Sequence, residues 1–127
     1  MSDTIKHHEQ KFERKQRLLL PSDYKFVFNQ SMRSSDKLLT ILAKKNAHKN
    51  HSRLGLTIAK KSVKTAVHRN RIKRLSREFF RLNKNTISCA DYVILVRKGI
   101  DQMSNETIVQ SLSKQFNYLR KQLNKNK

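Results

Sequence analysis

The sequence contains few of the residues that interrupt helices and strands or that cross-link a chain. Its 127 residues include two Gly, one Pro, one Cys and no Trp. A single cysteine excludes an internal disulfide and suits a reducing compartment. Cys89 adjoins an apolar run, so we expect it to be a small buried hydrophobe. The scarcity of Gly and Pro argues against a long low-complexity chain and favours a packed domain.

Long apolar segments are absent as well. No run approaches the roughly 20 residues needed to span a bilayer. Residues 1–17 are polar and basic, without the apolar stretch of a signal peptide. These absences argue against a membrane-spanning protein, and they predict a cytoplasmic location.

Acidic residues are few compared with basic ones. The chain has 9 Asp and Glu against 29 Lys and Arg, which gives a formal net charge of +20. A compact monomer with this charge repels itself and attracts polyanions. Nucleic acid and anionic membrane surfaces are therefore the two expected classes of partner.

Hydrophobic periodicity predicts one folded domain between two tails. Residues 1–17 are expected to form a flexible basic arm, 18–123 a single domain, and 124–127 a frayed basic tail. Ser22 is expected to cap a short helix that ends near residues 29–31. Apolar and alternating runs predict strands at 38–43, 54–59 and 91–96. We expect the first two strands to form a hairpin and the third to be central, because it is apolar on both faces.

Two longer helices complete the predicted order αββαβα. Residues 65–83 carry a stripe of Ile72, Leu75, Phe79 and Leu82. Ser104 is a good N-cap for a last helix, whose stripe is Ile108, Leu112, Phe116, Leu119 and Leu123. The order predicts an α+β fold, a two-layer sandwich of a small mixed sheet and packed helices.

Groups of catalytic or metal-binding side chains are missing from the pattern. Metal-dependent phosphodiester cleavage by a protein needs grouped carboxylates. Here the acids are scattered among different elements: Asp23, Asp36, Glu78, Asp91, Asp101 and Glu106. His48 and His51 have the spacing of half a zinc site, but no cysteine pair accompanies them. We therefore expect no catalytic residue and no metal site in the protein.

Residues 59–78 are dense in Lys and Arg and contain one acid, Glu78. A solvated face normally mixes both signs, so an unbalanced face favours a polyanion. On the predicted helix most of these cations lie opposite the apolar stripe, with Arg69 and Arg71 at its two edges. Their replacement is therefore expected to leave folding unchanged. The candidate RNA-binding residues are Lys60, Lys61, Lys64, Arg69, Asn70, Arg71, Lys73, Arg74, Arg77 and Arg81.

This stretch resembles a known family. Arg69-Asn70-Arg71, followed by Ile72-Lys73-Arg74-Leu75 and Arg77-Glu78, is similar to the Arg-Asn-Arg signature of the bacterial ribonuclease P protein subunit. The segment from Leu54 to Lys61 resembles the strand that leads into that helix, and the resemblance covers about residues 17–123. One departure is Gln30-Ser31, where many members carry a glycine.

The resemblance implies a fold and a set of partners. Members join two parallel strands through a left-handed crossover helix, in a ribosomal protein S5 domain 2-like fold, against the usual right-handed rule. Their RNA partner holds the catalytic Mg2+ and removes the 5′ leader from precursor tRNA. The implied partners are therefore the catalytic RNA subunit and precursor tRNA, with no obligate protein partner.

The resemblance also places the leader in a cleft between the first helix and the sheet. Tyr24 and Phe28 lie one helical turn apart, so their rings share a side. One face of strand 54–59 carries only small side chains, so another group can approach it closely, and this face is expected to leave a groove. The candidate cleft residues are Tyr24, Phe28, Thr57 and Ala59.

Composition alone leaves other functions open. A ribosomal, rRNA-binding structural protein has the same charge, and only the motif separates the two. A DNA-binding regulator would use residues 65–83 as a recognition helix, but no apolar helix is left over for a dimer seam. A membrane-surface protein would need the Ile72 stripe, which the core requires.

Overall fold

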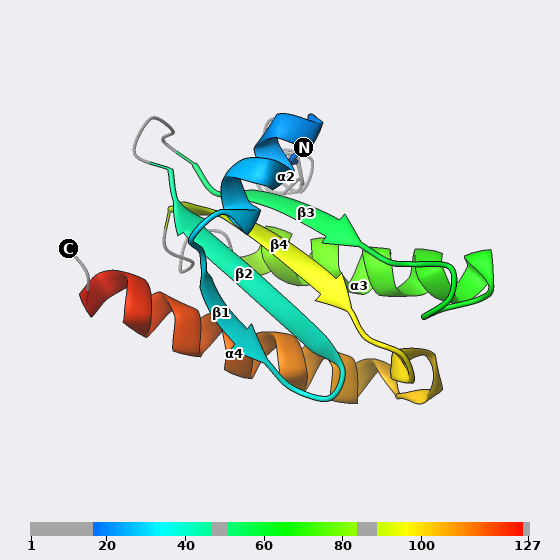
Figure 1. Cartoon of the computed structure of the whole chain (residues 1–127). Helices are drawn as coiled ribbons and strands as arrows, with labels where there is room; N and C mark the ends of the chain where they lie inside the picture. Colours follow the sequence, from blue (N-terminus) through cyan, green and yellow to red (C-terminus); the bar gives the residue numbers. More distant parts are fainter. Residues whose placement is uncertain (1–16, 47–50, 84–88, 126–127) are drawn as a thin grey trace, which may run out of the picture.

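The computed structural model describes residues 17–46, 51–83 and 89–125, and its elements form a four-stranded sheet with helices on both faces (Figure 1). The predicted arm therefore lies outside the described residues except for Arg17, and helix α4 continues into the predicted tail, to Lys125. The elements are α2 (Pro21–Phe28), β1 (Met32–Ser35), β2 (Leu39–Lys45), β3 (Arg53–Thr57), α3 (Ala66–Asn83), β4 (Ala90–Val96), the 3-10 helix η2 (Ile100–Gln102) and α4 (Asn105–Lys125).

The sheet has the strand order β1-β2-β4-β3. Strand β4 is antiparallel to β2 and parallel to β3, so the predicted hairpin between β2 and β3 is wrong. The reason is that β4 is buried on both faces and takes the central position, as its apolar sequence predicted. Strand β1 was not predicted, because its sequence Met-Arg-Ser-Ser lacks apolar alternation. It forms an edge by pairing with β2.

Helix α3 connects the parallel neighbours β3 and β4. In Figure 1 both strands point to the right, β4 lies below β3, and α3 passes behind the sheet. This arrangement is a left-handed crossover, as the family resemblance implied. The basic helix α3 therefore lies on one face of the sheet.

Helices α3 and α4 cover one face of the sheet. Phe80 and Tyr92 are buried there with Phe116, and their rings meet at centroid distances of 5.1–6.5 Å. The whole predicted stripe of α4 is buried, and Ser104 Oγ accepts the amide of Thr107 as the expected N-cap. The stripe of α3 is only partly correct. Its buried residues are Ile72, Ser76 and Phe80, Leu75 and Phe79 pack beside them, and Leu82 is 55% exposed.

The turn between β1 and β2 is tied to α4 through Asp36. The amides of Leu38 and Leu39 donate to its Oδ1, and the Ser111 hydroxyl on α4 donates to its Oδ2. Burial by itself raises the pKa of Asp36, but the hydrogen bonds from Ser111 and from the two amides outweigh it. The net effect lowers the pKa of this carboxyl below its ordinary value.

Helix α2 lies on the opposite face of the sheet from α3 and α4 (Figure 1). Its fully buried residue, Val27, packs with Leu18, Leu42 and Val93. The predicted cap is wrong, because the helix begins one residue before Ser22. Leu20 is the N-cap, and its amide donates to the carboxylate of Asp23, the third helical residue. Proline at the first helical position favours this earlier start.

Two further residues have unexpected surroundings. Gln30, at the departure from the family pattern, has a φ of 59°, a conformation that glycine adopts without penalty. Cys89, predicted to be buried, is exposed, and its thiol donates to Asn46 Oδ1 at 3.6 Å. The apolar run that suggested a core position begins one residue later, at Ala90.

Candidate nucleic-acid interface

The outer face of α3 forms a cationic groove of about 380 Å³. Helical periodicity brings side chains three and four residues apart onto this face, as predicted. Arg17 joins them from the segment that precedes α2, where it forms a single parallel bridge with Leu54 of β3. The groove is lined by Arg17, Asn70, Lys73, Arg74, Arg77, Glu78 and Arg81.

Electrostatics in this groove are dominated by one sign. Its single acid, Glu78, forms an ion pair with Arg81. Burial, and then the nearby charge of Arg17, lowers the pKa of Arg77 below its ordinary value. A guanidinium remains charged at neutral pH, so the crowded cations attract an anion that offsets their repulsion.

Arg69 and Arg71 have partners within the protein. The Nη1 atom of Arg69 donates to the carbonyl oxygens of Val63 and Lys64, both at 2.9 Å. Arg71 donates to the carbonyls of Asp101 and Met103 and, at 2.7 Å, to Asn105 Oδ1. Both residues thus fasten loops to α3. Because of these contacts we now expect their replacement to lower stability, which helical periodicity alone does not reveal.

The loop held by Arg69 carries the remaining predicted cations. The amides of Ser62 and Val63 donate to the carbonyl of Ala59, and the Val63 side chain is buried. Lys60, Lys61 and Lys64 are exposed on this turn. They therefore extend the basic surface from the end of β3 to the start of α3.

The predicted leader-cleft residues divide into a packed and an exposed set. A Cβ atom placed on Gly55 would lie 2.6 Å from Tyr24 Cε1, so the Tyr24 ring occupies the space above this glycine. The close approach was predicted, but at Gly55 it is made by Tyr24 and leaves no open groove. Phe28 is 50% exposed, Thr57 is exposed, and Ala59 is partly buried.

Phe26 of α2 does not pack into the core beneath the helix. Its side chain is 41% exposed, and the Lys44 ammonium lies 4.3 Å from the ring centroid. Val27 alone points fully into the core from this helix. The surface around α2 therefore presents the rings of both Phe26 and Phe28.

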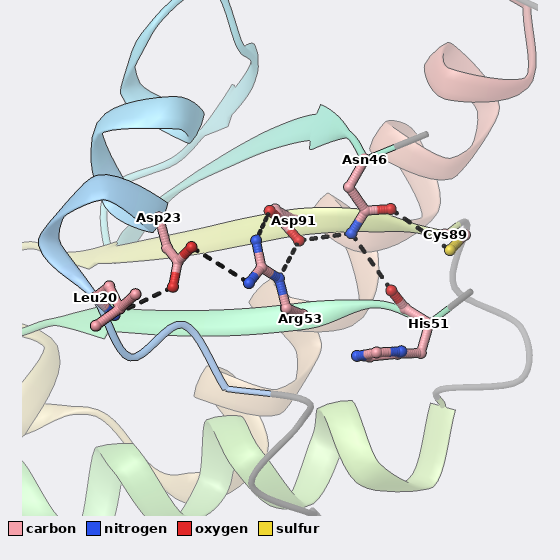
Figure 2. Close-up of polar contacts among 7 residues, drawn as sticks. All are labelled: Leu20, Asp23, Asn46, His51, Arg53, Cys89 and Asp91. Atoms are coloured by element: carbon pink, nitrogen blue, oxygen red, sulfur yellow. Dashed lines mark hydrogen bonds and ion pairs between the residues drawn. The ribbon is translucent and has the colours of Figure 1, made fainter. Parts of the chain in front are cut away.

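A polar network that sequence reasoning missed connects α2 to the sheet (Figure 2). The guanidinium of Arg53 on β3 binds both carboxylate oxygens of the buried Asp91, at 2.8 and 2.5 Å. Its Nη1 atom also lies 3.3 Å from Asp23 Oδ1 on α2. Asn46 donates to Asp91 at 2.6 Å. The hydrogen bonds that Arg53 donates to Asp91, reinforced by the charge of that carboxylate, raise the pKa of Arg53. The sequence did contain one signal for this network, because Asp91 is an acidic residue within the apolar run 90–96.

Metal ligands are not gathered in the part of the chain that the structure describes. No group of three or more His, Cys, Asp or Glu there is arranged to hold an ion. Asp23 and Asp91 both form ion pairs with the guanidinium of Arg53. His48 lies outside the described residues. No helix within residues 17–46, 51–83 and 89–125 is long and apolar enough to cross a membrane.

Comparisons with known proteins agree with the motif. The family model described as Ribonuclease P matches residues 12–120. The ribonuclease P protein component of Pseudoalteromonas translucida (strain TAC 125) is 52% identical over 103 residues, covering 81% of this chain and 73% of that relative. The component of Proteus mirabilis is 48% identical over the same length, covering 81% and 86%.

Solved structures agree as well. The Staphylococcus aureus RNase P protein superimposes with a TM-score of 0.78 at 26% identity, over 83% of this chain and 95% of that one. The Thermotoga maritima RNase P protein gives a TM-score of 0.69 at 30% identity, over 79% and 94%. The ribosomal alternative is not favoured by any of these matches. The chain therefore belongs to the ribonuclease P protein family.

Proposed function

We propose that the chain is a non-catalytic subunit of this endoribonuclease, which binds the catalytic RNA and the 5′ leader of precursor tRNA. It assists endonucleolytic removal of the leader, which produces the mature 5′ end of the tRNA. The observation that carries the proposal is the groove on α3, where Arg17 and the α3 cations meet around one paired acid. The proposal includes a cytoplasmic location for the protein.

The groove on α3 is the proposed site for the catalytic RNA. Arg74, Arg77 and Lys73 supply phosphate contacts, and Asn70 supplies a hydrogen-bonding group for a base edge or ribose hydroxyl. Arg69 and Arg71 contribute charge at its ends while holding the neighbouring loops. An RNA backbone in this groove would relieve the repulsion among the cations.

The surface beside α2 is the proposed site for the leader. The half-exposed ring of Phe28 offers a face on which an unpaired base stacks, an interaction worth about 1–3 kcal/mol per base. Tyr24 supports this surface from its position on Gly55. Thr57 and Ala59 continue toward Lys60 and Lys61, whose ammonium groups are phosphate partners.

The Mg2+ ions of the reaction are proposed to be held mainly by the RNA. The residues that the structure describes do not fit this ion, because they present no group of three acidic or other metal-binding side chains. What the protein contributes is positive charge and a leader-binding surface. Both reduce the magnesium concentration at which the RNA binds its substrate.

Reconstitution tests whether the RNA catalyses cleavage and the protein only assists it. Protein freed of RNA, its catalytic RNA, and the two together are incubated with labelled precursor tRNA at low and high magnesium. We expect no cleavage by the protein alone, and a larger stimulation of the RNA at low magnesium. Correct cleavage of the precursor by protein shown to be free of RNA would refute the proposal.

A second experiment tests the leader surface. Phe28→Ala should weaken binding of precursor tRNA with a leader of several nucleotides, by roughly 5- to 150-fold for one stacked base. Binding of mature tRNA should stay nearly unchanged. Circular dichroism confirms that the variant is folded. An unchanged ratio of the two affinities would place the leader elsewhere.

A further inference from the structure

Helix α2 is fastened to the sheet at both of its ends by cations from one row of the sheet. Lys44 on β2 and Arg53 on β3 are both register partners of Asp91 on the central strand. Arg53 Nη1 lies 3.3 Å from the carboxylate of Asp23, near the beginning of α2. Lys44 Nζ donates to the carbonyl of Asn29, just after its end, at 2.6 Å. The helix therefore spans this row, with a polar tie at each end.

The arginine that binds the beginning of α2 is itself held by a buried carboxylate. Two nitrogens of Arg53 bind the carboxylate of Asp91, whose side chain is fully buried and also accepts from Asn46 (Figure 2). The guanidinium is thus held in place before it reaches Asp23. Asp23 uses its other oxygen to accept the amide of Leu20 at the helix N-cap. One carboxylate joins the start of the helix to the buried network.

The apolar anchorage of α2 is small. The helix has eight residues, a length at which a helix has little stability of its own. Val27 is its one fully buried side chain, and the ring of Tyr24 rests on Gly55. Because so few apolar contacts hold the helix, the two ties contribute strongly to its position. The ring of Phe28, one turn after Tyr24, moves with the helix.

We propose that Asp23 and Lys44 are positioning residues for leader binding. They act through α2 by holding it where the exposed ring of Phe28 meets the bases of a single-stranded RNA. This inference rests on the proposed function of Phe28. It assigns a role to two side chains that do not themselves have to touch the leader.

Asp23→Asn is the first test. The change removes the ion pair with Arg53, while the remaining amide oxygen can still accept the amide of Leu20. It also removes one negative charge, and Glu106→Gln in the exposed first turn of α4 is the control for that effect. In the reconstituted holoenzyme we compare the affinities for precursor tRNA and for mature tRNA. Asp23→Asn should lower their ratio about twofold to fivefold, and Glu106→Gln should not change it.

A double-mutant cycle with Phe28→Ala separates positioning from a general loss of structure. If Asp23 acts through Phe28, adding Asp23→Asn to Phe28→Ala should produce no further decrease in the ratio. Equal losses in both backgrounds would overturn the inference. So would an unchanged ratio in Asp23→Asn when Phe28→Ala alone lowers it. An unchanged ratio in Phe28→Ala itself would instead refute the proposed leader contact.

Lys44→Met provides an independent measurement at the other end of α2. The thioether side chain keeps much of the aliphatic length but loses the hydrogen bond to Asn29. The same cycle with Phe28→Ala should again show no additional loss. If Asp23→Asn does not fold, the Lys44 cycle decides, and additive effects of Lys44→Met and Phe28→Ala would overturn the proposal.

Discussion

Replacing Gly55 by alanine would place a methyl group against the ring of Tyr24. The new Cβ would lie 2.6 Å from Cε1, 2.8 Å from Cζ and 2.8 Å from Oη of that ring. Carbon atoms in contact are normally separated by about 3.5–4.0 Å, so the ring has to retreat by roughly 1 Å. Since Tyr24 belongs to α2, this movement pushes the helix away from β3.

The expected cost follows from this overlap. Overpacking of a core typically destabilises by about 1–3 kcal/mol. Tyr24 is only partly buried on a short helix and can yield, so we expect the lower half of this range. Thermal unfolding followed by circular dichroism should show a midpoint lowered by roughly 3–10 °C, between the values for smaller and larger domains.

Two further variants make the prediction specific. In a Tyr24→Ala background the ring is gone, and Gly55→Ala should then cost little. Gly99→Ala is the control, because Gly99 has a φ of 100° and its Cβ would meet nothing within 4 Å. Its backbone strain should be the same with and without the Tyr24 ring. If Gly55→Ala cost as much in the Tyr24→Ala background as in the natural sequence, the ring contact would not be its cause.

Arg71→Ala should lower the free energy of unfolding by about 1–2 kcal/mol, since it loses its bonds to the loop before α4; equal stability to the natural protein in urea titration would contradict this. Arg74→Ala should unfold normally but lower the salt slope of catalytic-RNA binding by roughly 0.7–0.9 per lost phosphate contact, and an unchanged slope would remove Arg74 from the interface. Gln30→Gly should raise the free energy of unfolding by about 1 kcal/mol, because it relieves a positive φ; a lower unfolding midpoint than that of the natural protein would show that the strain is negligible. Because the folded-state pKa of Asp36 is lowered, its contribution is present above the unfolded pKa of about 4 and is lost as pH falls through the folded value. Asp36→Asn should therefore destabilise the protein at pH 7 and lose this effect in acid, as thermal unfolding at several pH values would show.

The elements with a strong local pattern were predictable from the sequence. The apolar segment 91–96 identified the central strand, and the stripe from Ile108 to Leu123 identified the buried face of α4. Strand β1 and the order of the strands were not predictable in this way. A four-residue polar edge has no pattern of its own, and pairing depends on contacts between distant segments.

In the candidate site, too, local features were predictable from the sequence and long-range contacts were not. Helical spacing correctly grouped the cations of α3, because that grouping is local. The loop contacts of Arg69 and Arg71 and the pairing of Arg53 with Asp91 were missed. In each case the partners are distant in sequence or are backbone carbonyls, which carry no sequence signal. The contact of Tyr24 with Gly55 was predicted in part. The small residues on this face predicted that some group approaches the strand closely, but they did not identify Tyr24 as that group.

The bridge between Arg17 and Leu54 holds the segment before α2 beside β3. Arg17 lines the groove on α3, and only three residues later Leu20 caps the helix that carries Phe28. Three fully extended residues span at most about 11 Å, and the amide of Leu18 is held by the carbonyl of Leu54. The segment from Arg17 to Leu20 therefore limits how far the start of α2 can lie from the groove on α3. Lengthening this short segment would therefore loosen the geometric relation between the groove and the helix that carries Phe28.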